Sequence, residues 1–142
     1  GGKSGNYIGW KNLPVKPDIS TMGKAITAGT FPLSLVLYND KIHDSLPKNF
    51  NWTHGFTYTY SMPGILSALK YIDILEKEQI LANHYTLKEK ARAVFSKAGY
   101  QIINTFGLHF MIRNDDDDQM LYVIPLNATD EYFEVLLKNL ST

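Results

Sequence analysis

Short apolar runs separated by turn residues dominate the first part of the chain. The run Ile19–Met22 follows Pro17-Asp18, and Leu33–Tyr38 is apolar and β-branched enough for a buried strand. For the shorter apolar stretch Asn6–Trp10 we expect an edge strand, and for Ile42–Leu46 a single helical turn. The pattern therefore predicts strand, turn and strand, with loops before and after them.

Helical spacing begins at Pro63. Apolar residues recur at intervals of three or four positions from Pro63 to Gln79, and Pro63 suits a first helical turn because its missing N–H would have no partner there. A second helix is expected from about Tyr85 to Ala98, with Gly99 as its C-terminal stop. These two helices occupy the middle of the chain.

The remaining residues predict three strands and a helix. The strands are expected at Tyr100–Thr105, Leu108–Arg113 and Met120–Pro125, and the helix at Asp130–Leu140, where Asn127 or Thr129 would form the N-cap. A helix, three strands and a helix are typical of a small α+β lobe. We therefore expect a lobe boundary near Leu81–His84, which divides the chain into residues 1–81 and 82–142.

The composition narrows the possible functions. The 142 residues include 14 basic and 14 acidic side chains, a balance that does not favour a nucleic-acid or membrane partner. With no cysteine, the chain has no disulfide, thiolate catalysis or cysteine-based metal site. No apolar run reaches the roughly 20 residues of a membrane helix. We expect a cytoplasmic protein, and interpret the Gly-rich opening without an initiator Met as a fragment of a longer chain.

Lys24 is the residue whose surroundings suggest chemistry. It follows the apolar run Ile19–Met22 and precedes the small residues Ala25–Gly29. A cofactor that reacts through an aldehyde needs a lysine amine at the end of a rigid element, and small residues leave room for its ring. From this segment alone, a surface lysine in a Gly-rich loop explains the pattern equally well.

Two stretches in this order resemble the class III aminotransferases, which use pyridoxal 5′-phosphate (PLP). The first is residues 17–34, PDISTMGKAITAGTFPLS, and the second is His54-Gly55-Phe56-Thr57, followed by Pro63 and a helix. The opening Gly2-Lys3-Ser4-Gly5 is similar to a Gly-Arg-Thr-Gly segment of that family. The resemblance covers residues 1–81 and weakens beyond them.

The resemblance implies a fold of the α/β class: the C-terminal part of a fold-type I PLP transferase large domain, followed by a small α+β lobe. It implies that Lys24 is catalytic and forms the Schiff base with PLP, and that Thr57 binds the PLP phosphate, usually that of the neighbouring subunit. His54 matches the motif's histidine, for which we expect a structural role. The substrates would be an amine or ω-amino donor and a keto or aldehyde acceptor.

The same resemblance implies partners. The family's phosphate-binding loop and the Asp that pairs with the pyridinium nitrogen lie upstream of the residues that match Gly1–Gly5. We therefore expect this chain to work with the N-terminal half of the same enzyme, in a homodimer, and to be inactive alone.

Two departures from the family pattern leave alternatives open. Many members carry an Arg for the substrate carboxylate where this chain has about Leu121, with Arg113 as the only nearby substitute. The chain also carries an extra residue around 58–60, relative to the family's spacing. A related PLP enzyme, such as an aminomutase or a decarboxylating condensing enzyme, fits the same motifs, and a non-catalytic remnant would tolerate the loss of the Arg. The presence of both Lys24 and Thr57 favours an enzyme.

Two further motifs predict little. Gly2-Lys3-Ser4 matches the tail of a phosphate-binding P-loop, without the upstream glycine and strand that such a loop needs. Asp115–Asp118 lacks the alternating ligands and distal Glu of a calcium-binding EF-hand loop, so we expect a solvated hairpin turn there. We expect no metal site.

Overall fold

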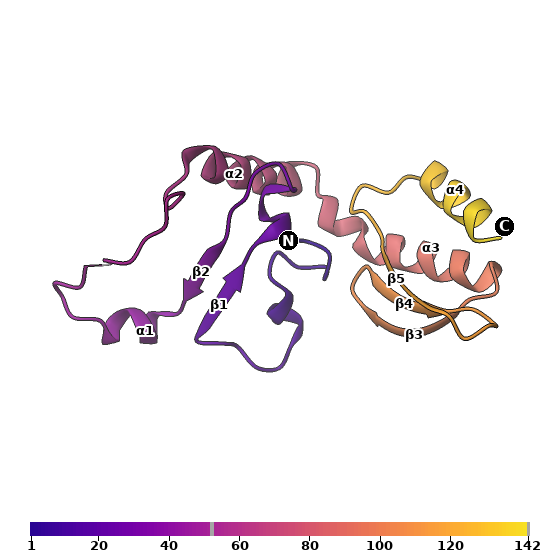
Figure 1. Cartoon of the computed structure of the whole chain (residues 1–142), viewed down its shortest axis with the longest axis horizontal. Coiled ribbons are helices and arrows are strands. Elements are labelled where there is room, and N and C mark those ends of the chain that lie inside the picture. Colours follow the sequence, from indigo (N-terminus) through magenta and orange to yellow (C-terminus); the bar gives the residue numbers. More distant parts are fainter. Residues whose placement is uncertain (52, 142) are drawn as a thin grey trace.

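The computed structural model describes residues 1–51 and 53–141 (Figure 1). Its helices and strands are β1 (Ile19–Met22), β2 (Leu35–Tyr38), α1 (Asp40–Ser45), α2 (Met62–Lys77), α3 (His84–Lys97), β3 (Gln101–Phe106), β4 (His109–Arg113), β5 (Gln119–Val123) and α4 (Asp130–Leu140). Three 3-10 helices complete them: η1 (Gly9–Asn12), η2 (Lys24–Thr27) and η3 (Ile80–Asn83). The strand pair with α2 and the three-stranded sheet with α3 and α4 follow one another along the molecule's long axis.

The first part is built on two antiparallel strands. β1 pairs with β2 from Ile19 opposite Tyr38 to Met22 opposite Leu35, and η2 lies between them in the chain and packs against α2. Other residues of the chain cover little of this sheet, and Ile19 is therefore 55% exposed and Val36 63% exposed. The strands therefore present apolar side chains to solvent.

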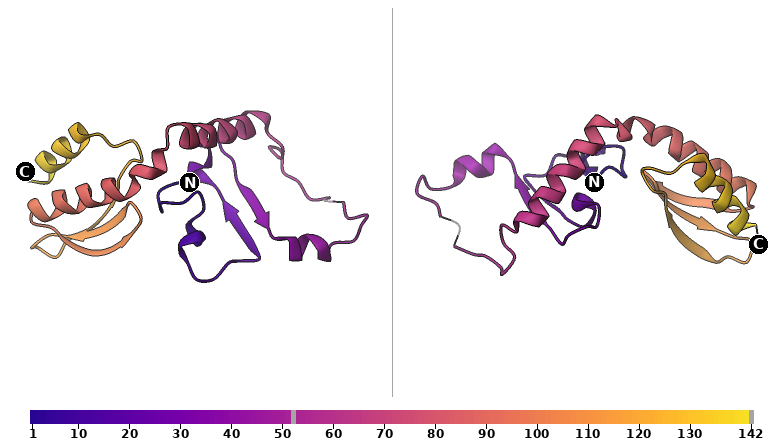
Figure 2. Two further views of the ribbon diagram at one scale, coloured as in Figure 1. Left: turned by 180° about the vertical axis from the view of Figure 1, so that it is seen from behind. Right: turned by 90° about the horizontal axis from the view of Figure 1, so that it is seen from above.

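The second part has its own core. β3, β4 and β5 form an antiparallel sheet in that order, and α3 and α4 lie on the same side of it (Figure 2). The aromatic ring of Phe95 from α3 lies 5.3 Å from that of Phe110 and 5.6 Å from that of Tyr122, measured between ring centroids. The buried cluster comprises Leu87, Ala91, Phe95, Leu108, Phe110, Ile112, Ile124, Phe133 and Leu136. All of these residues follow α2 in the chain.

The first residues of the chain join the two parts. The Lys3 carbonyl accepts hydrogen bonds from Leu108 N at 2.8 Å and from His84 Nε2 at 3.0 Å, so Nε2 carries the ring hydrogen. Tyr71 of α2 donates to the Gly1 carbonyl at 3.1 Å, and burial raises the pKa of its hydroxyl. The backbone of Gly107 also lies against Lys3, and a Cβ there would stand 2.1 Å from the Lys3 oxygen. One short segment thus contacts both parts.

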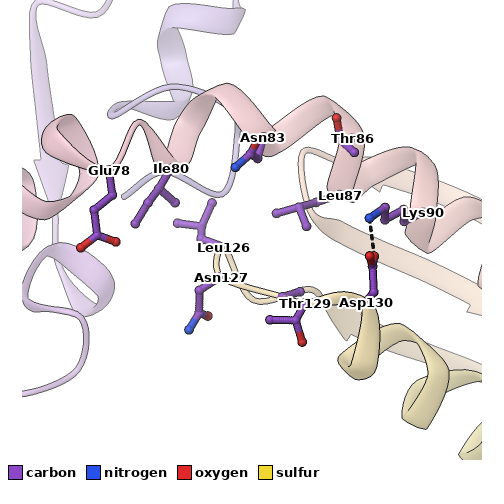
Figure 3. Close-up of a pocket in the computed structure, with 11 residues that line it drawn as sticks. Glu78, Ile80, Asn83, Thr86, Leu87, Lys90, Leu126, Asn127, Thr129 and Asp130 are labelled. Atoms are coloured by element: carbon purple, nitrogen blue, oxygen red, sulfur yellow. Dashed lines mark hydrogen bonds and ion pairs between the residues drawn. The ribbon is translucent and has the colours of Figure 1, made fainter.

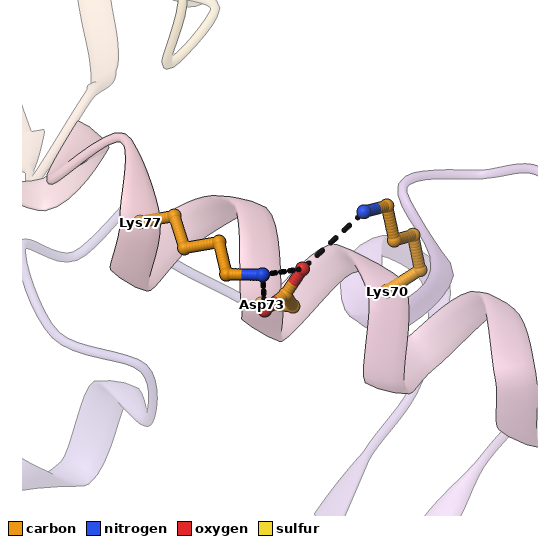
Figure 4. A network of polar contacts seen from close by, with 3 residues as sticks. All are labelled: Lys70, Asp73 and Lys77. Atoms are coloured by element: carbon orange, nitrogen blue, oxygen red, sulfur yellow. Dashed lines mark hydrogen bonds and ion pairs between the residues drawn. The ribbon is translucent and has the colours of Figure 1, made fainter.

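Helix α2 is amphipathic. Gly64, Ala68 and Leu75 are buried on one side. On its exposed surface, Asp73 lies between Lys70 and Lys77, whose Nζ atoms are 3.3 and 2.9 Å from its carboxylate oxygens (Figure 4). Hydrogen bonds from Lys77 and then Lys70 hold the pKa of Asp73 below its usual range. Such exposed pairs are screened by water and salt, so burial rather than charge fixes this helix.

Most expected elements are confirmed. The predicted helices over 63–79 and 85–98 are α2 and α3 with small shifts, and α4 has the predicted bounds. Thr129, one of the two expected caps, accepts a hydrogen bond from Tyr132 N at 3.3 Å. Residues 114–118 form the turn between β4 and β5, as expected for the aspartate run.

The edge strand predicted for Asn6–Trp10 is wrong. The chain instead enters η1 at Gly9, because side-chain bonds close this segment on itself: Asn6 bonds to Asn12, and the Asn12 amide donates to the Ser4 carbonyl at 2.6 Å. β2 also begins at Leu35 rather than Leu33. Leu33 packs against Gly64 of α2 instead of entering the ladder.

We expect Gly107→Ala to lower the free energy of unfolding by about 3 kcal/mol, from the left-handed backbone and from overlap with Lys3. Gly107 has a φ of 60°, and the new Cβ would meet backbone atoms that cannot rotate away. Gly99→Ala is the control, since Gly99 is also left-handed but has no atom within 4 Å of its Cβ position. Urea denaturation measures the free energy of unfolding of both variants. If both lose the same amount of stability, the contact with Lys3 contributes nothing to the effect of Gly107→Ala.

Candidate active site

Lys24 lies two residues after the end of β1, at the start of η2, in a left-handed backbone conformation with a φ of 51°. Few residues other than glycine adopt this region, and its cost is tolerated where the surrounding structure enforces it. Ala28 and Gly29 follow with φ values of 52° and 78°, so the chain reverses within a few residues. Ile26, buried between them, anchors this reversal beside α2.

Lys24 lines an open groove of about 1010 Å³. The side chains of Phe31, Phe56, Tyr58 and Tyr60 give it aromatic walls. The other lining residues are Gly23, Gly29, Pro32, Leu33, Ser34, Leu35, Val36, His54, Gly55, Thr59 and Ile65. Among these described residues Lys24 is the one lysine or arginine, and no carboxylate is present. The groove thus offers a primary amine beside flat apolar surfaces.

The segment after His54 is a pair of overlapping turns. Thr59 N donates to the Phe56 carbonyl at 2.9 Å, while Thr59 Oγ1 accepts from Phe56 N at 2.6 Å. Tyr60 has a φ of 60°, at the place where the sequence predicts an extra residue. The hydroxyl that closes this turn is therefore that of Thr59.

Thr57 is exposed and does not line the groove. Within the described part of the chain, its hydroxyl makes no hydrogen bond. The structure therefore brings Lys24 together with the neighbours of Thr57, not with Thr57 itself. A free hydroxyl in a turn remains available to a group outside this chain.

His54 contacts a ring rather than a proton acceptor. Its imidazole stands edge-on to Phe56, with ring centroids 4.8 Å apart and planes at 89°. Such a contact orients the aromatic wall of the groove. This is in line with the structural role expected for His54.

The two residues considered for carboxylate binding lie on the three-stranded sheet. Leu121 is on β5 opposite Met111 and is 61% exposed, on the face away from the core because side chains alternate along a strand. Arg113 donates to Asp117 at 2.9 Å and to Gln101 at 2.6 Å beside the β4–β5 turn. Arg113 is thus engaged at the end of the hairpin.

A second groove, of about 550 Å³, lies between the start of α3 and the segment before α4 (Figure 3). An ion pair between Lys90 and Asp130 crosses it, and Asn83, Thr86 and Asn127 add polar groups. None of the residues predicted for the active site lines it. Leu87, which also belongs to the core cluster, forms part of its wall.

The described residues offer neither a metal cluster nor a membrane span. Within residues 1–51 and 53–141, no three His, Asp or Glu side chains gather closely enough to hold a metal ion. No helix in this part of the chain combines the length and apolar character needed to cross a membrane. The amine of Lys24 and its groove remain the principal chemical feature.

Sequence reasoning missed the aromatic walls of the groove. Phe31, Tyr58 and Tyr60 come from two loops separated by β2 and α1, and only the tertiary structure shows that they face one groove. The dense run of aromatic and hydroxyl residues from Phe56 to Tyr60 was the available signal. All three of its aromatic side chains are more than 75% exposed, which is unusual for rings of this size.

The chain is similar to known proteins both in sequence and in fold. The sequence pattern of the family described as aminotransferase class-III matches residues 1–108. The chain is 28% identical to the mitochondrial ornithine aminotransferase of Drosophila melanogaster over 136 residues, which cover 96% of this chain and 29% of that protein. It is similarly 28% identical over 111 residues to the adenosylmethionine-8-amino-7-oxononanoate aminotransferase of Anoxybacillus flavithermus, covering 75% and 24%.

A solved transaminase from the marine bacterium Virgibacillus superposes with a TM-score of 0.80 at 21% identity, over 99% of this chain and 41% of that one. This likeness confirms the predicted fold, the C-terminal part of a fold-type I PLP transferase. The chain spans less than half the length of that structure and less than a third of the two sequence relatives.

Proposed function

Because this chain belongs to the class III aminotransferase family, whose members depend on PLP, we propose that it is part of a PLP-dependent aminotransferase with Lys24 as its catalytic lysine. The observation that carries the proposal is the left-handed Lys24 at the end of β1, lining a groove with aromatic walls. The reaction would move an amino group from an amine donor to a keto or aldehyde acceptor.

The residues of the groove fit this cofactor. PLP, when bound through a lysine amine, supplies an electron sink for the carbon that exchanges its amino group. Phe31 and Phe56 offer flat faces to a ring, and Gly29 leaves open space where a side chain would stand. The Nζ amine of Lys24 would hold the cofactor and, once released from it, would carry a proton.

Thr57 is proposed to bind the cofactor phosphate of a second subunit. It is exposed, it lies outside the groove of its own chain, and its hydroxyl has no partner in the described residues. A hydroxyl and the amides of a turn make a good donor set for an anion. The separation of Lys24 from Thr57 within one chain is what a site shared between two subunits requires.

The partners follow from what this chain leaves uncovered. Val36, Tyr38, Phe56 and Tyr58 are at least 50% exposed, and such clustered apolar surface usually marks an interface. We propose that the N-terminal portion of the enzyme and a second subunit cover it, in a homodimer. With no cysteine to indicate an oxidising compartment, we place the enzyme in the cytoplasm.

We further propose that residues 1–81 belong to the PLP-binding large domain and residues 82–142 to a small lobe. The buried core cluster begins at Leu87 and includes no residue of the first part. The segment Gly1–Gly5 would then fix the small lobe beside the large domain through Lys3 and His84.

The substrate is proposed to carry its amino group away from any carboxylate. Leu121 occupies the expected place of the carboxylate-binding Arg, and an apolar side chain there cannot neutralise a buried charge. Arg113 is engaged at the hairpin turn and is not a ready substitute. The donors that fit are an ω-amino acid, a diamine or an amino sugar.

Borohydride reduction of the complete protein loaded with PLP should fix one pyridoxyl group on Lys24. The reason is that Lys24 alone among the lysines lines the aromatic groove. Peptide mapping by mass spectrometry locates the label, and a Lys24→Ala chain is the control. A label on another lysine in the wild-type protein would overturn the assignment.

Replacing Thr57 by Ala should weaken PLP binding by on the order of 1–3 kcal/mol, the usual cost of losing a hydrogen bond to a charged group. Equilibrium dialysis of the complete protein measures the affinity. Thr53→Ala removes an exposed hydroxyl from the same segment and should leave the affinity unchanged. If Thr57→Ala also leaves it unchanged, Thr57 does not bind the phosphate.

Mixed dimers test whether Thr57 acts across the interface. A dimer of one Lys24→Ala chain and one Thr57→Ala chain should contain one site of native affinity, because that site combines Lys24 of one subunit with Thr57 of the other. Calorimetric titration counts such sites. If Thr57 acted within its own chain, the mixed dimer would contain none.

A donor screen tests the substrate class. We expect ω-amino acids, diamines or amino sugars to give higher turnover than simple α-amino acids with the complete enzyme, measured by loss of the keto acceptor. A Leu121→Arg variant should shift the preference toward α-amino acids. Highest turnover with simple α-amino acids in the wild type would refute this substrate class while leaving transamination intact.

A further inference from the structure

Thr27 carries a polar group in an otherwise apolar interior. It is 1% exposed and is the one buried polar side chain among residues 1–51 and 53–141. Its Oγ1 lies 2.6 Å from the Phe31 carbonyl oxygen and 3.5 Å from that of Lys24. Because a hydroxyl has a single hydrogen to donate, the short contact to Phe31 is the main bond. Burying a hydroxyl costs free energy unless it makes such a hydrogen bond.

This bond closes the chain reversal that contains Lys24. It runs from η2, which starts at Lys24, to the residue where the chain turns toward β2. The Thr27 carbonyl is used as well, accepting from Thr30 N at 3.1 Å and from Thr30 Oγ1 at 2.7 Å. The hydroxyl and the carbonyl of Thr27 therefore both connect the start of the reversal to its end by hydrogen bonds.

The two ends of the reversal are both walls of the groove. Lys24 and Phe31 line it together, so the loop between them sets the position of the amine relative to the aromatic ring. On its other side Phe31 lies against Gly64 of α2, where an added Cβ would stand 3.1 Å from the ring. Phe31 is thus held between α2 and the bond from Thr27.

Thr27 is also suited to hold a strained backbone. The left-handed φ of Lys24 persists only if its surroundings enforce it. A β-branched side chain has few accessible rotamers, so its hydroxyl loses little freedom when it bonds. Valine has the same shape and stiffness without the hydrogen-bond donor.

We propose that Thr27 is a positioning residue for the reaction at Lys24: its hydroxyl bond to Phe31 keeps Lys24 in the left-handed conformation from which its amine reaches the cofactor. This inference rests on the proposed role of Lys24. The inference adds one requirement, a hydrogen-bond donor on the side chain at position 27. A side chain that only filled the same space would not meet it.

The first measurement is the rate at which PLP attaches to Lys24, followed by borohydride trapping after increasing times of mixing with the complete apo-protein. Thr27→Val should slow attachment about tenfold, the factor that corresponds to one hydrogen bond. Thr27→Ser keeps the donor and should stay within about twofold of the wild type. Thr21→Val, which removes an exposed hydroxyl from β1 and breaks no bond of the reversal, should do the same.

The second measurement needs no PLP. Trypsin cleaves after lysine, and cleavage requires the loop to open. Thr27→Val should raise cleavage of the Lys24–Ala25 bond about tenfold, while cleavage after Lys48, outside the reversal, stays constant. Thr27→Ser should again behave like the wild type.

The outcomes separate the two proposals. Faster cleavage with unchanged PLP attachment in Thr27→Val would make Thr27 merely structural and overturn the positioning role. Equal behaviour of Thr27→Val and wild type in both measurements would overturn it too. A wild-type protein that takes no pyridoxyl group on Lys24 refutes the proposed function itself, and the inference with it, even if the cleavage rates change as expected.

Discussion

The short reversal of the chain between β1 and β2 determines where the Lys24 amine stands. The two strands are antiparallel neighbours, so the chain must return within one strand spacing. It does so through left-handed residues at Lys24, Ala28 and Gly29. The hydrogen bond from Thr27 to Phe31 closes the reversal. The position of the amine, the aromatic wall beside it and the packing against α2 all follow from this geometry.

The two parts of the chain bury their apolar residues unequally. The second part surrounds Phe95 and Phe110 with a complete core, whereas the strands of the first part keep Ile19 and Val36 more than half exposed. The part that carries Lys24 is therefore the part that depends on other surfaces. This fits the proposal that Lys24 reacts with a cofactor, because a neutral lysine amine needs a dry environment and this chain alone leaves that part uncovered.

The junction at Lys3 makes the two parts one unit. A single carbonyl accepts from the backbone of Leu108 and from the ring of His84, and Gly107 permits the close approach that these bonds require. The sequence similarity to a Gly-Arg-Thr-Gly segment marked residues 2–5 without indicating this contact. Their glycines meet Leu126 and His84, residues far along the chain.

What the sequence by itself determined is local. Helical spacing, the Thr129 cap and the Gly99 stop specify α3 and α4 through interactions within a few residues, and the motif around Lys24 identifies the family. Short local signals failed where side chains had competing partners, as at Asn6, whose bond to Asn12 replaced a strand.

Only the tertiary structure decided which residues share the groove. It joined Phe31 to Tyr58 and left Thr57 outside, and it brought Lys3 to Gly107. These contacts link positions that are far apart in sequence, and each depends on how helices and strands pack. Periodicity specifies which face of an element is apolar, but it does not specify what that face meets. Which surfaces pack together depends on burial and on shape complementarity, and both exist only once the chain has folded.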